Sequence, residues 1–331
     1  MPEQSHLRLL LSGAAQPLLG QVELPHDILC ARNGPVSRAV LTAALNLELL
    51  ADLLLRVPSG RAYVEDVLRG GRTLMFDHGA LRTVAMNGMG HLPAGQAAIT
   101  RVLEPLGYES VHTYPMPQLK MTGRSFTHRD LPEALPQFFV SELHPEQFSH
   151  AFQAAVQRVT EDSTDPLTRG DIALLAQLKK ARALSLIEAR RLLPKLVASF
   201  SRRHGTPSLA DYEILRAESA EMAWVATEGN AFNHATDRVA SLTSVVIAQR
   251  VLGRRVKGRV EVSASGRVRQ TALHADPVMR DFRADDGTII QREVPGSFFE
   301  FIERARLPGE GRLDLAFDTN NAQGIFKMTA A

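Results

Sequence analysis

The feature that most constrains the fold of this chain is a seven-residue pattern that occurs twice. Residues 76–82 read Phe-Asp-His-Gly-Ala-Leu-Arg, and residues 232–238 read Phe-Asn-His-Ala-Thr-Asp-Arg. In an extended strand alternate side chains share a face, so a histidine and an arginine four residues apart point the same way. Two such strands would offer imidazoles and guanidiniums to one cavity. This combination suits a metal ion that binds an anionic ligand.

Each copy of the pattern opens a similar series of predicted elements. The first copy lies in a strand over 72–85, and after it we expect a helix over 95–106 and strands over 110–114, 119–126 and 137–143. The second lies in a strand over 231–239, followed by a helix over 241–251 and strands over 256–263, 267–275, 288–294 and 297–303. A Leu-Gly pair ends each helix, which is typical of a helix C-terminus. Both halves therefore read strand, helix and at least three strands, as in an α+β fold.

Helical patterns lie around these two β-rich parts. Residues 38–56 have leucines at every fourth position on one face, which predicts a helix. Residues 145–227 also show helical spacing, and a short helix is expected over 325–328.

The domain organisation follows from these elements. Residues 1–36 lack periodicity and contain Pro17, Pro25 and Pro35, so we expect an N-terminal arm. Residues 37–331 are expected to form a single catalytic domain. Its parts are a β-rich module over 70–144, a helical insertion over 145–227 and a second β-rich module over 228–331.

Composition limits the class of protein. A chain of 331 residues with 44% hydrophobic and 22% charged residues can bury a substantial core. The net charge of +2, with acids and bases interspersed, gives no reason to expect a nucleic-acid partner. Cys30 is the only cysteine, which excludes intramolecular disulfides and fits a reducing compartment. Neither a membrane span nor a secretory leader is recognised, so the expected location is cytoplasmic.

A further candidate for chemistry lies in the strand over 297–303, which is apolar on both faces. Alternation puts Glu300 and Phe298 on one face, and Phe299 and Phe301 on the other. Burying a carboxylate there is unfavourable unless it is paired or bound to a metal ion. The alternative is a structural ion pair with a nearby arginine.

His78, His234 and Glu300 therefore form a candidate metal-binding set. Two imidazoles and one carboxylate on one side of Fe(II) leave three positions open, enough for a bidentate 2-oxo acid and dioxygen. For each histidine alone, the alternative is a hydrogen-bonded residue of the core.

Arg82 and Arg238 are the candidates for binding a substrate carboxylate. The planar guanidinium group matches a carboxylate with two parallel hydrogen bonds. The alternative for each is an ion pair with an acid such as Asp77 or Asp237. Arg82 is favoured for the substrate, and the role of Arg238 stays open between the two.

From about residue 38 to residue 328 the chain resembles the 2-oxoadipate dioxygenase/decarboxylase family. The shared motifs are Asp-His-Gly-Ala-x-Arg at 77–82, Asn-His at 233–234 and the strand that contains Glu300. The first motif, followed by a helix and Leu-Gly-Tyr-Glu at 106–109, also resembles the opening of a vicinal-oxygen-chelate module. The strand around Glu300 is similar to the glutamate-bearing strand of 4-hydroxyphenylpyruvate dioxygenase.

This resemblance implies a fold and an activity. The fold would be two vicinal-oxygen-chelate βαβββ modules that form a curved mixed sheet around a metal site. Fe(II) would be bound by His78, His234 and Glu300, with Arg82 as the catalytic-site residue that binds a substrate carboxylate. The enzyme would convert 2-oxoadipate, or a similar 2-oxo acid, and O2 to 2-hydroxyglutarate and CO2.

Two other functions stay open. A vicinal-oxygen-chelate lyase or isomerase would use Zn(II), Ni(II) or Mn(II) as a Lewis acid, and metal identity and oxygen dependence would distinguish it. A non-catalytic binding protein of the same fold would have no need of a buried Glu300. The sequence does not indicate the exact 2-oxo acid, the oligomeric state or the role of the helical insertion.

Overall fold

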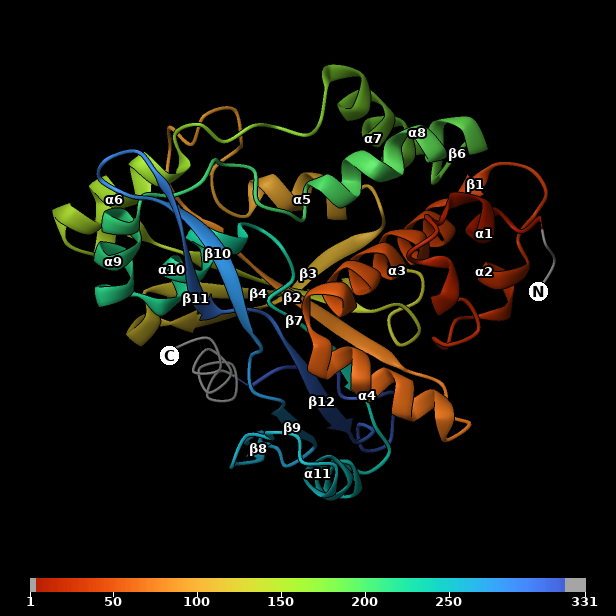
Figure 1. Ribbon diagram of the computed structural model, residues 1–331. Coiled ribbons are helices and arrows are strands. Elements are labelled where there is room, and N and C mark those ends of the chain that lie inside the picture. Colours follow the sequence, from red (N-terminus) through yellow and green to blue (C-terminus); the bar gives the residue numbers. More distant parts are fainter. Residues whose placement is uncertain (1–3, 319–331) are drawn as a thin grey trace.

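The computed structural model describes residues 4–318, and the helix expected over 325–328 lies outside this range. At its centre is a curved, mixed sheet of eight strands in the order β3-β4-β5-β2-β7-β12-β9-β8 (Figure 1). The strands are β2 (Phe76–Val84), β3 (Tyr108–Met116), β4 (Met121–His128), β5 (Gln137–Leu143), β7 (His234–Arg238), β8 (Glu261–Val262), β9 (Val268–Ala272) and β12 (Phe298–Arg304).

The strand order divides the sheet into two matching halves. In the first half β2 leads into α5 (Ala97–Leu103), and β5 returns parallel to β2. In the second half β7 leads into α11 (Leu242–Val251), and β12 returns parallel to β7. β2 and β7 pair antiparallel at the centre, so the two copies of the repeated pattern lie side by side. The predicted pair of βαβββ modules is confirmed.

One predicted strand lies outside this sheet. The strand expected over 288–294 is β11 (Ile289–Pro295), which forms a separate hairpin with β10 (Pro277–Arg283). No strand was expected over β10. Phe282 and Val294 are the buried side chains of this hairpin, so it lacks the apolar alternation that marks a strand of a packed sheet.

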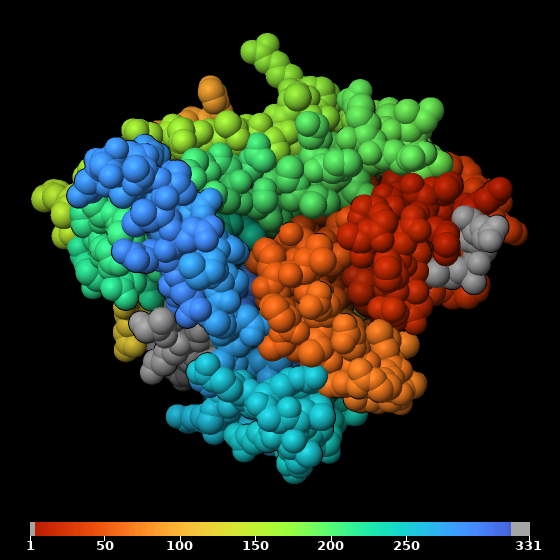
Figure 2. Space-filling model, in the orientation of Figure 1, coloured from red at the N-terminus to blue at the C-terminus, as the bar shows by residue number. Residues whose placement is uncertain are grey.

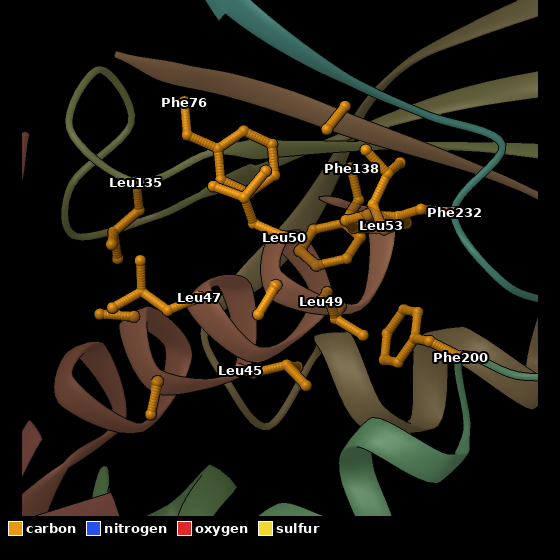
Figure 3. Close-up of a cluster of buried hydrophobic side chains, with 14 of the residues drawn as sticks. Leu45, Leu47, Leu49, Leu50, Leu53, Phe76, Leu135, Phe138, Phe200 and Phe232 are labelled. Carbon is orange, nitrogen blue, oxygen red and sulfur yellow. The ribbon is translucent and has the colours of Figure 1, made fainter. Parts of the chain in front are cut away.

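A helical layer covers one face of the sheet. The predicted helix over 38–56 is α3 (Arg38–Arg56), and α4 (Pro58–Arg69) follows it. Leucines of α3 pack against Phe76, Phe138 and Phe232 (Figure 3). This apolar cluster packs on one side of the strands. The opposite face, called the polar face below, carries the polar residues of the candidate site beside a second apolar cluster that includes Ala80 and Phe139.

The N-terminal segment differs from the expected irregular arm. It contains α1 (His6–Leu10) and α2 (His26–Cys30), and β1 (Val36–Ser37) ends it. Leu7 and Ile28 are buried in the same apolar cluster as α3. Each of the two helices has five residues, which is too short to show a helical periodicity in the sequence. A boundary between an arm and a catalytic domain after residue 36 stays a prediction.

The segment 145–227 is helical, as expected. Its elements are α6 (His150–Thr160), α7 (Arg169–Ala181), the short strand β6 (Ala183–Leu184) paired with β1, α8 (Leu186–Ala198), α9 (Leu209–Glu218) and α10 (Ala220–Glu228). Ser185 and Ser208 cap the starts of α8 and α9, and each accepts a hydrogen bond from the backbone N–H of an acidic residue three positions further on. α9 and α10 are two separate helices, because Ser219 ends the first and caps the second.

The β10–β11 hairpin lies across these helices. Figure 2 shows the hairpin (blue) against the insertion (green) on the surface. Phe282 contacts the ring of Tyr212 at 4.8 Å between centroids, and Arg280 Nε lies 2.7 Å from Glu228 Oε1. Within residues 4–318, no helix has the length and apolar character needed to cross a membrane.

Candidate metal centre

Three buried side chains from adjacent strands converge on the polar face of the sheet. His78 lies on β2, His234 on β7 and Glu300 on β12. His78 Nε2 and His234 Nε2 lie 3.1 and 3.4 Å from Glu300 Oε2, and 3.4 Å from each other. Their exposed fractions are 2%, 4% and 0%. The structure thus brings the three predicted candidates together into a group that could hold a metal ion.

A β-bulge gives His78 its direction. The pairing of β2 with β7 shifts register between Phe76 and His78. Phe76 packs in the apolar cluster with α3, and so does Leu81, which lies five residues further along. Alternate residues share a face, so residues five apart share one only where an extra residue is inserted. The bulge therefore turns His78 away from the core and toward Glu300.

The donor atoms fit a metal ion. Two ligands bound at about 2.1 Å and at right angles lie about 3 Å apart, which is close to the spacing in this group. Two imidazole nitrogens and one carboxylate are also the donor set of non-haem Fe(II) centres. Glu300 Oε1 is buried and has no hydrogen-bond partner within the part of the chain that the structure describes. A nearby cation would compensate this carboxylate.

The two histidines differ in their electrostatic setting. Burial lowers the pKa of His234 to about 3, although the charge of Glu300 opposes the shift. His234 is therefore neutral near pH 7, which is the form that binds metals. Burial acts in the same direction on His78, but hydrogen bonds to Asp77 and Glu300 outweigh it and raise its pKa. Burial would raise the pKa of Glu300, yet His234 and His78 hold it below its ordinary value.

Asp77 contacts the second ring nitrogen of His78. Asp77 Oδ1 lies 2.9 Å from His78 Nδ1, and Arg304 donates to the same carboxylate from Nη2 at 2.9 Å and from Nε at 3.0 Å. Burial would raise the pKa of Asp77, but the charge of Arg304 holds it far below its usual range. An ionised carboxylate only accepts hydrogen bonds, so Nδ1 of His78 bears the proton. Nε2 is then the ring nitrogen whose lone pair a metal ion between His78 and Glu300 would take.

Two polar residues of this centre were not predicted. Thr236 Oγ1 donates to Glu300 Oε2 at 2.7 Å and lies 3.1 Å from His78 Nε2. Its position two residues after His234 on a strand was the available signal, because such residues share a face. Arg304 lies four residues after Glu300 on β12, which is the same kind of signal.

Arg82 lies on the strand of His78, four residues further along, and is fully buried. Its guanidinium carbon lies 4.9 Å from the ring centroid of Trp224 in α10. Burial lowers the pKa of Arg82 to about 10, against the opposing charge of Glu221. Arg82 is therefore a buried cation near pH 7.

Arg238 contacts Asp77 and the backbone of Glu133. Its Nη1 lies 3.7 Å from Asp77 Oδ2, and its Nη2 donates to the carbonyl oxygen of Glu133 at 3.0 Å. Arg238 thus makes the ion pair with Asp77 that was one of its two expected roles, and a contact with substrate stays a prediction. The bulge explains the pairing, because it turns Asp77 as well as His78 toward the polar face.

Aromatic rings flank both imidazoles. Phe298 stacks on His234 with centroids 4.8 Å apart, and Phe317 meets His78 edge-on at 4.8 Å. These rings exclude water from the centre, which strengthens the electrostatic interactions within it.

Comparisons with known proteins agree with this geometry. A family model described as 2-oxoadipate dioxygenase/decarboxylase matches residues 53–327. A curated relative, the chloroplastic 2-oxoadipate dioxygenase/decarboxylase of Arabidopsis thaliana, is 25% identical over 285 residues. That alignment covers 77% of this chain and 68% of the plant protein.

Solved structures show the same fold. A glyoxalase-superfamily protein from Ralstonia eutropha has a TM-score of 0.89 and 50% identity, with 95% of this chain and 97% of that chain covered. The hydroxyglutarate synthase of Oryza sativa, solved in complex with 2-oxoadipate, has a TM-score of 0.68 and 22% identity, with 91% and 97% covered. At that identity the likeness shows the fold alone. Because the family model spans most of the chain, the protein belongs to the 2-oxoadipate dioxygenase/decarboxylase family.

Proposed function

We propose that this protein is an Fe(II)-dependent enzyme that converts 2-oxoadipate, or a similar 2-oxo acid, and O2 to 2-hydroxyglutarate and CO2. The observation that carries the proposal is the convergence of His78, His234 and Glu300 in a buried group. Membership of the family supports the reaction class. The rice relative, solved with 2-oxoadipate, supports the substrate class.

His78, His234 and Glu300 would hold the iron. Fe(II) in this donor set would supply open coordination positions and the redox chemistry of an oxygen-dependent decarboxylation. Neutral His234 and ionised Glu300 match the protonation states that such binding needs. Thr236 donates to Glu300 and so orients the carboxylate.

Arg82 would bind the carboxylate at the far end of the substrate. It remains a cation near pH 7 and is out of contact with bulk water, where a charged hydrogen bond is strong. Four residues of strand separate its backbone from that of His78 by about 13 Å, and the long arginine side chain can shorten that gap. This arrangement favours a 2-oxo acid with a second carboxylate over a short one such as pyruvate.

The test is oxygen uptake by Fe(II)-loaded protein with a panel of 2-oxo acids of different length. We expect the fastest uptake with 2-oxoadipate, with one CO2 released per O2 consumed and 2-hydroxyglutarate as the product. Absence of both oxygen uptake and decarboxylation with every acid would overturn the proposal. Turnover without oxygen and with Zn(II), Ni(II) or Mn(II) would instead indicate a lyase or isomerase.

A further inference from the structure

The two copies of the repeated pattern differ at the residue before the histidine. This residue is Asp77 in the first copy and Asn233 in the second. Asp77 is bonded to Nδ1 of His78, whereas Nδ1 of His234 is buried without a hydrogen-bond partner among residues 4–318. The two imidazoles of the centre are therefore supported unequally, one by a charge and the other by stacking on Phe298.

All three guanidinium nitrogens of Arg304 donate hydrogen bonds. Two of its nitrogens bind the carboxylate of Asp77, and Nη1 donates to the carbonyl oxygens of Asp314 and Ala316 at 2.9 and 3.0 Å. The Arg304 side chain has no exposed surface, and its guanidinium carbon lies 5.0 Å from the ring centroid of Phe317. A side chain bound on all sides is a rigid anchor.

We propose that Asp77 and Arg304 form a positioning pair for His78. Asp77 fixes the tautomer and the orientation of the ring, so that Nε2 faces the metal, and Arg304 fixes Asp77. Histidines that bind metals commonly donate their other ring N–H to a carboxylate or a carbonyl group, which fixes the ring. The inference rests on the proposed metal site and adds the residues that give His78 its direction. It also makes β12 the source of one ligand and of the support for another.

Simple charge effects make the opposite prediction for Arg304. Arg304 and Arg238 are cations near the centre, and through-space repulsion would weaken the binding of a divalent ion. On that account, removal of Arg304 would tighten metal binding. If Arg304 acts by holding Asp77, its removal weakens metal binding. The sign of the change therefore distinguishes the two explanations.

The experiment measures the dissociation constant of Zn(II) by competition with a chelator, using the full chain. We expect Asp77→Asn to bind about 10- to 100-fold more weakly than the wild type. Arg304→Met should also bind more weakly, and Arg304→Lys, which keeps the charge but not the fork, should lie between Arg304→Met and the wild type. The matched control is Asp237→Asn, which replaces a buried carboxylate bonded to Tyr63 on the other face of the sheet and should bind as the wild type does.

Nuclear magnetic resonance of the histidine ring nitrogens supplies a second readout. In the Zn(II)-loaded wild type we expect a protonated Nδ1 and a metal-bound Nε2 for His78, and in Asp77→Asn a shifted or averaged Nδ1 signal. Tighter binding by Arg304→Met, or an unchanged affinity and Nδ1 signal in Asp77→Asn, would overturn the inference. If Asp77→Asn does not fold, Arg304→Lys decides the question, because wild-type metal affinity in Arg304→Lys would also overturn the inference. A wild type that binds no metal would instead refute the proposed function.

Discussion

Glu300 occupies a setting that a carboxylate tolerates only with compensation. It has no exposed surface, and phenylalanines flank it on β12. Thr236 and the two histidines contact Oε2, while Oε1 has no hydrogen-bond partner within residues 4–318. Removing a charge from water without full pairing is strongly unfavourable, so a stability role alone explains Glu300 poorly. At the scale of single residues, metal binding accounts for it best.

Replacing His234 tests this ligand set. We expect His234→Ala to lose bound metal and activity together, because two ligands do not hold an ion as three do. Metal content measured by elemental analysis is the readout, and His112→Ala, which alters an exposed histidine on β3, is the control. Unchanged metal content in His234→Ala would remove His234 from the ligand set.

Arg82 should act on substrate binding rather than on the metal. A charged hydrogen bond contributes about 1.5–3 kcal/mol, so Arg82→Met should raise KM for 2-oxoadipate about 10- to 100-fold. The affinity of Arg82→Met for the metal ion should equal that of the wild type. The matched substrate is a 2-oxo acid of equal length without the second carboxylate, for which the variant and the wild type should be similar. An equal loss with both acids would show that Arg82 does not bind that carboxylate.

The buried carboxyl group of Asp237 should make the stability of the fold depend on pH, independently of the metal. Burial raises its pKa from 3.8 to about 7, although hydrogen bonds from Tyr63 and the backbone of Met75 oppose the shift. Between these values the folded protein keeps a proton that the unfolded chain releases, so stability falls as pH rises through this window. In Asp237→Asn this dependence should be absent. Melting temperatures from about pH 5 to pH 8 measure it, and parallel curves for the two proteins would contradict it.

At the scale of elements, the seam between β2 and β7 holds the two halves together. Phe232 of the second copy of the pattern lies directly over Gly79 of the first. A side chain added at Gly79 would have its Cβ 2.3 Å from Phe232 Cζ. Phe232 also contacts Phe76 and Phe138, so it has little room to move. The two copies of the pattern therefore interlock.

Gly79→Ala should destabilise the fold by about 1–3 kcal/mol, because an extra methyl group at this seam forces a displacement of the packed ring. Gly258→Ala is the control, since a Cβ there meets nothing within 4 Å and the change should be small. Chemical unfolding measures both. Equal stability of the two variants would show that Phe232 yields without strain.

The elements of the site were predictable to different degrees. His78, His234, Arg82 and Glu300 stand out because a repeated pattern and strand alternation are properties of the chain itself. Their convergence depends on the pairing of β2, β7 and β12, which no local pattern specifies. The bulge is likewise invisible in the sequence, because a regular strand would put Phe76 and His78 on one face. The role of Asp77 follows only once that bulge is known.

At the scale of the whole molecule, the helical insertion contacts one of the candidate site residues. It separates the two halves in the sequence, yet its last helix, α10, places Trp224 against Arg82. Trp224 Nε1 in turn donates to the carbonyl oxygen of Gly296, just before β12. Helical periodicity predicted the presence of the insertion but not this contact, because packing between distant segments is absent from local spacing.

A bound ion should stabilise the whole chain. Its ligands come from both halves, and an ion that binds only the folded state adds about 2.7 kcal/mol at a free concentration of 100 times its Kd. We expect the melting temperature to rise with Zn(II) and to return after chelation, with no such rise in His234→Ala. An unchanged melting temperature of the wild type on addition of Zn(II) would contradict this expectation.

The backbone pairing of β2, β7 and β12 has a consequence for when the metal enters. These strands are hydrogen-bonded to one another, and the apolar cluster around α3 packs on their other face. The positions of the ligands are thus determined by folding itself, unlike small zinc domains that fold only around their ion. The proposed Fe(II) would then be able to enter the folded protein after synthesis. Under the proposed function, its occupancy, and with it the activity, should follow the current iron supply rather than the supply at synthesis.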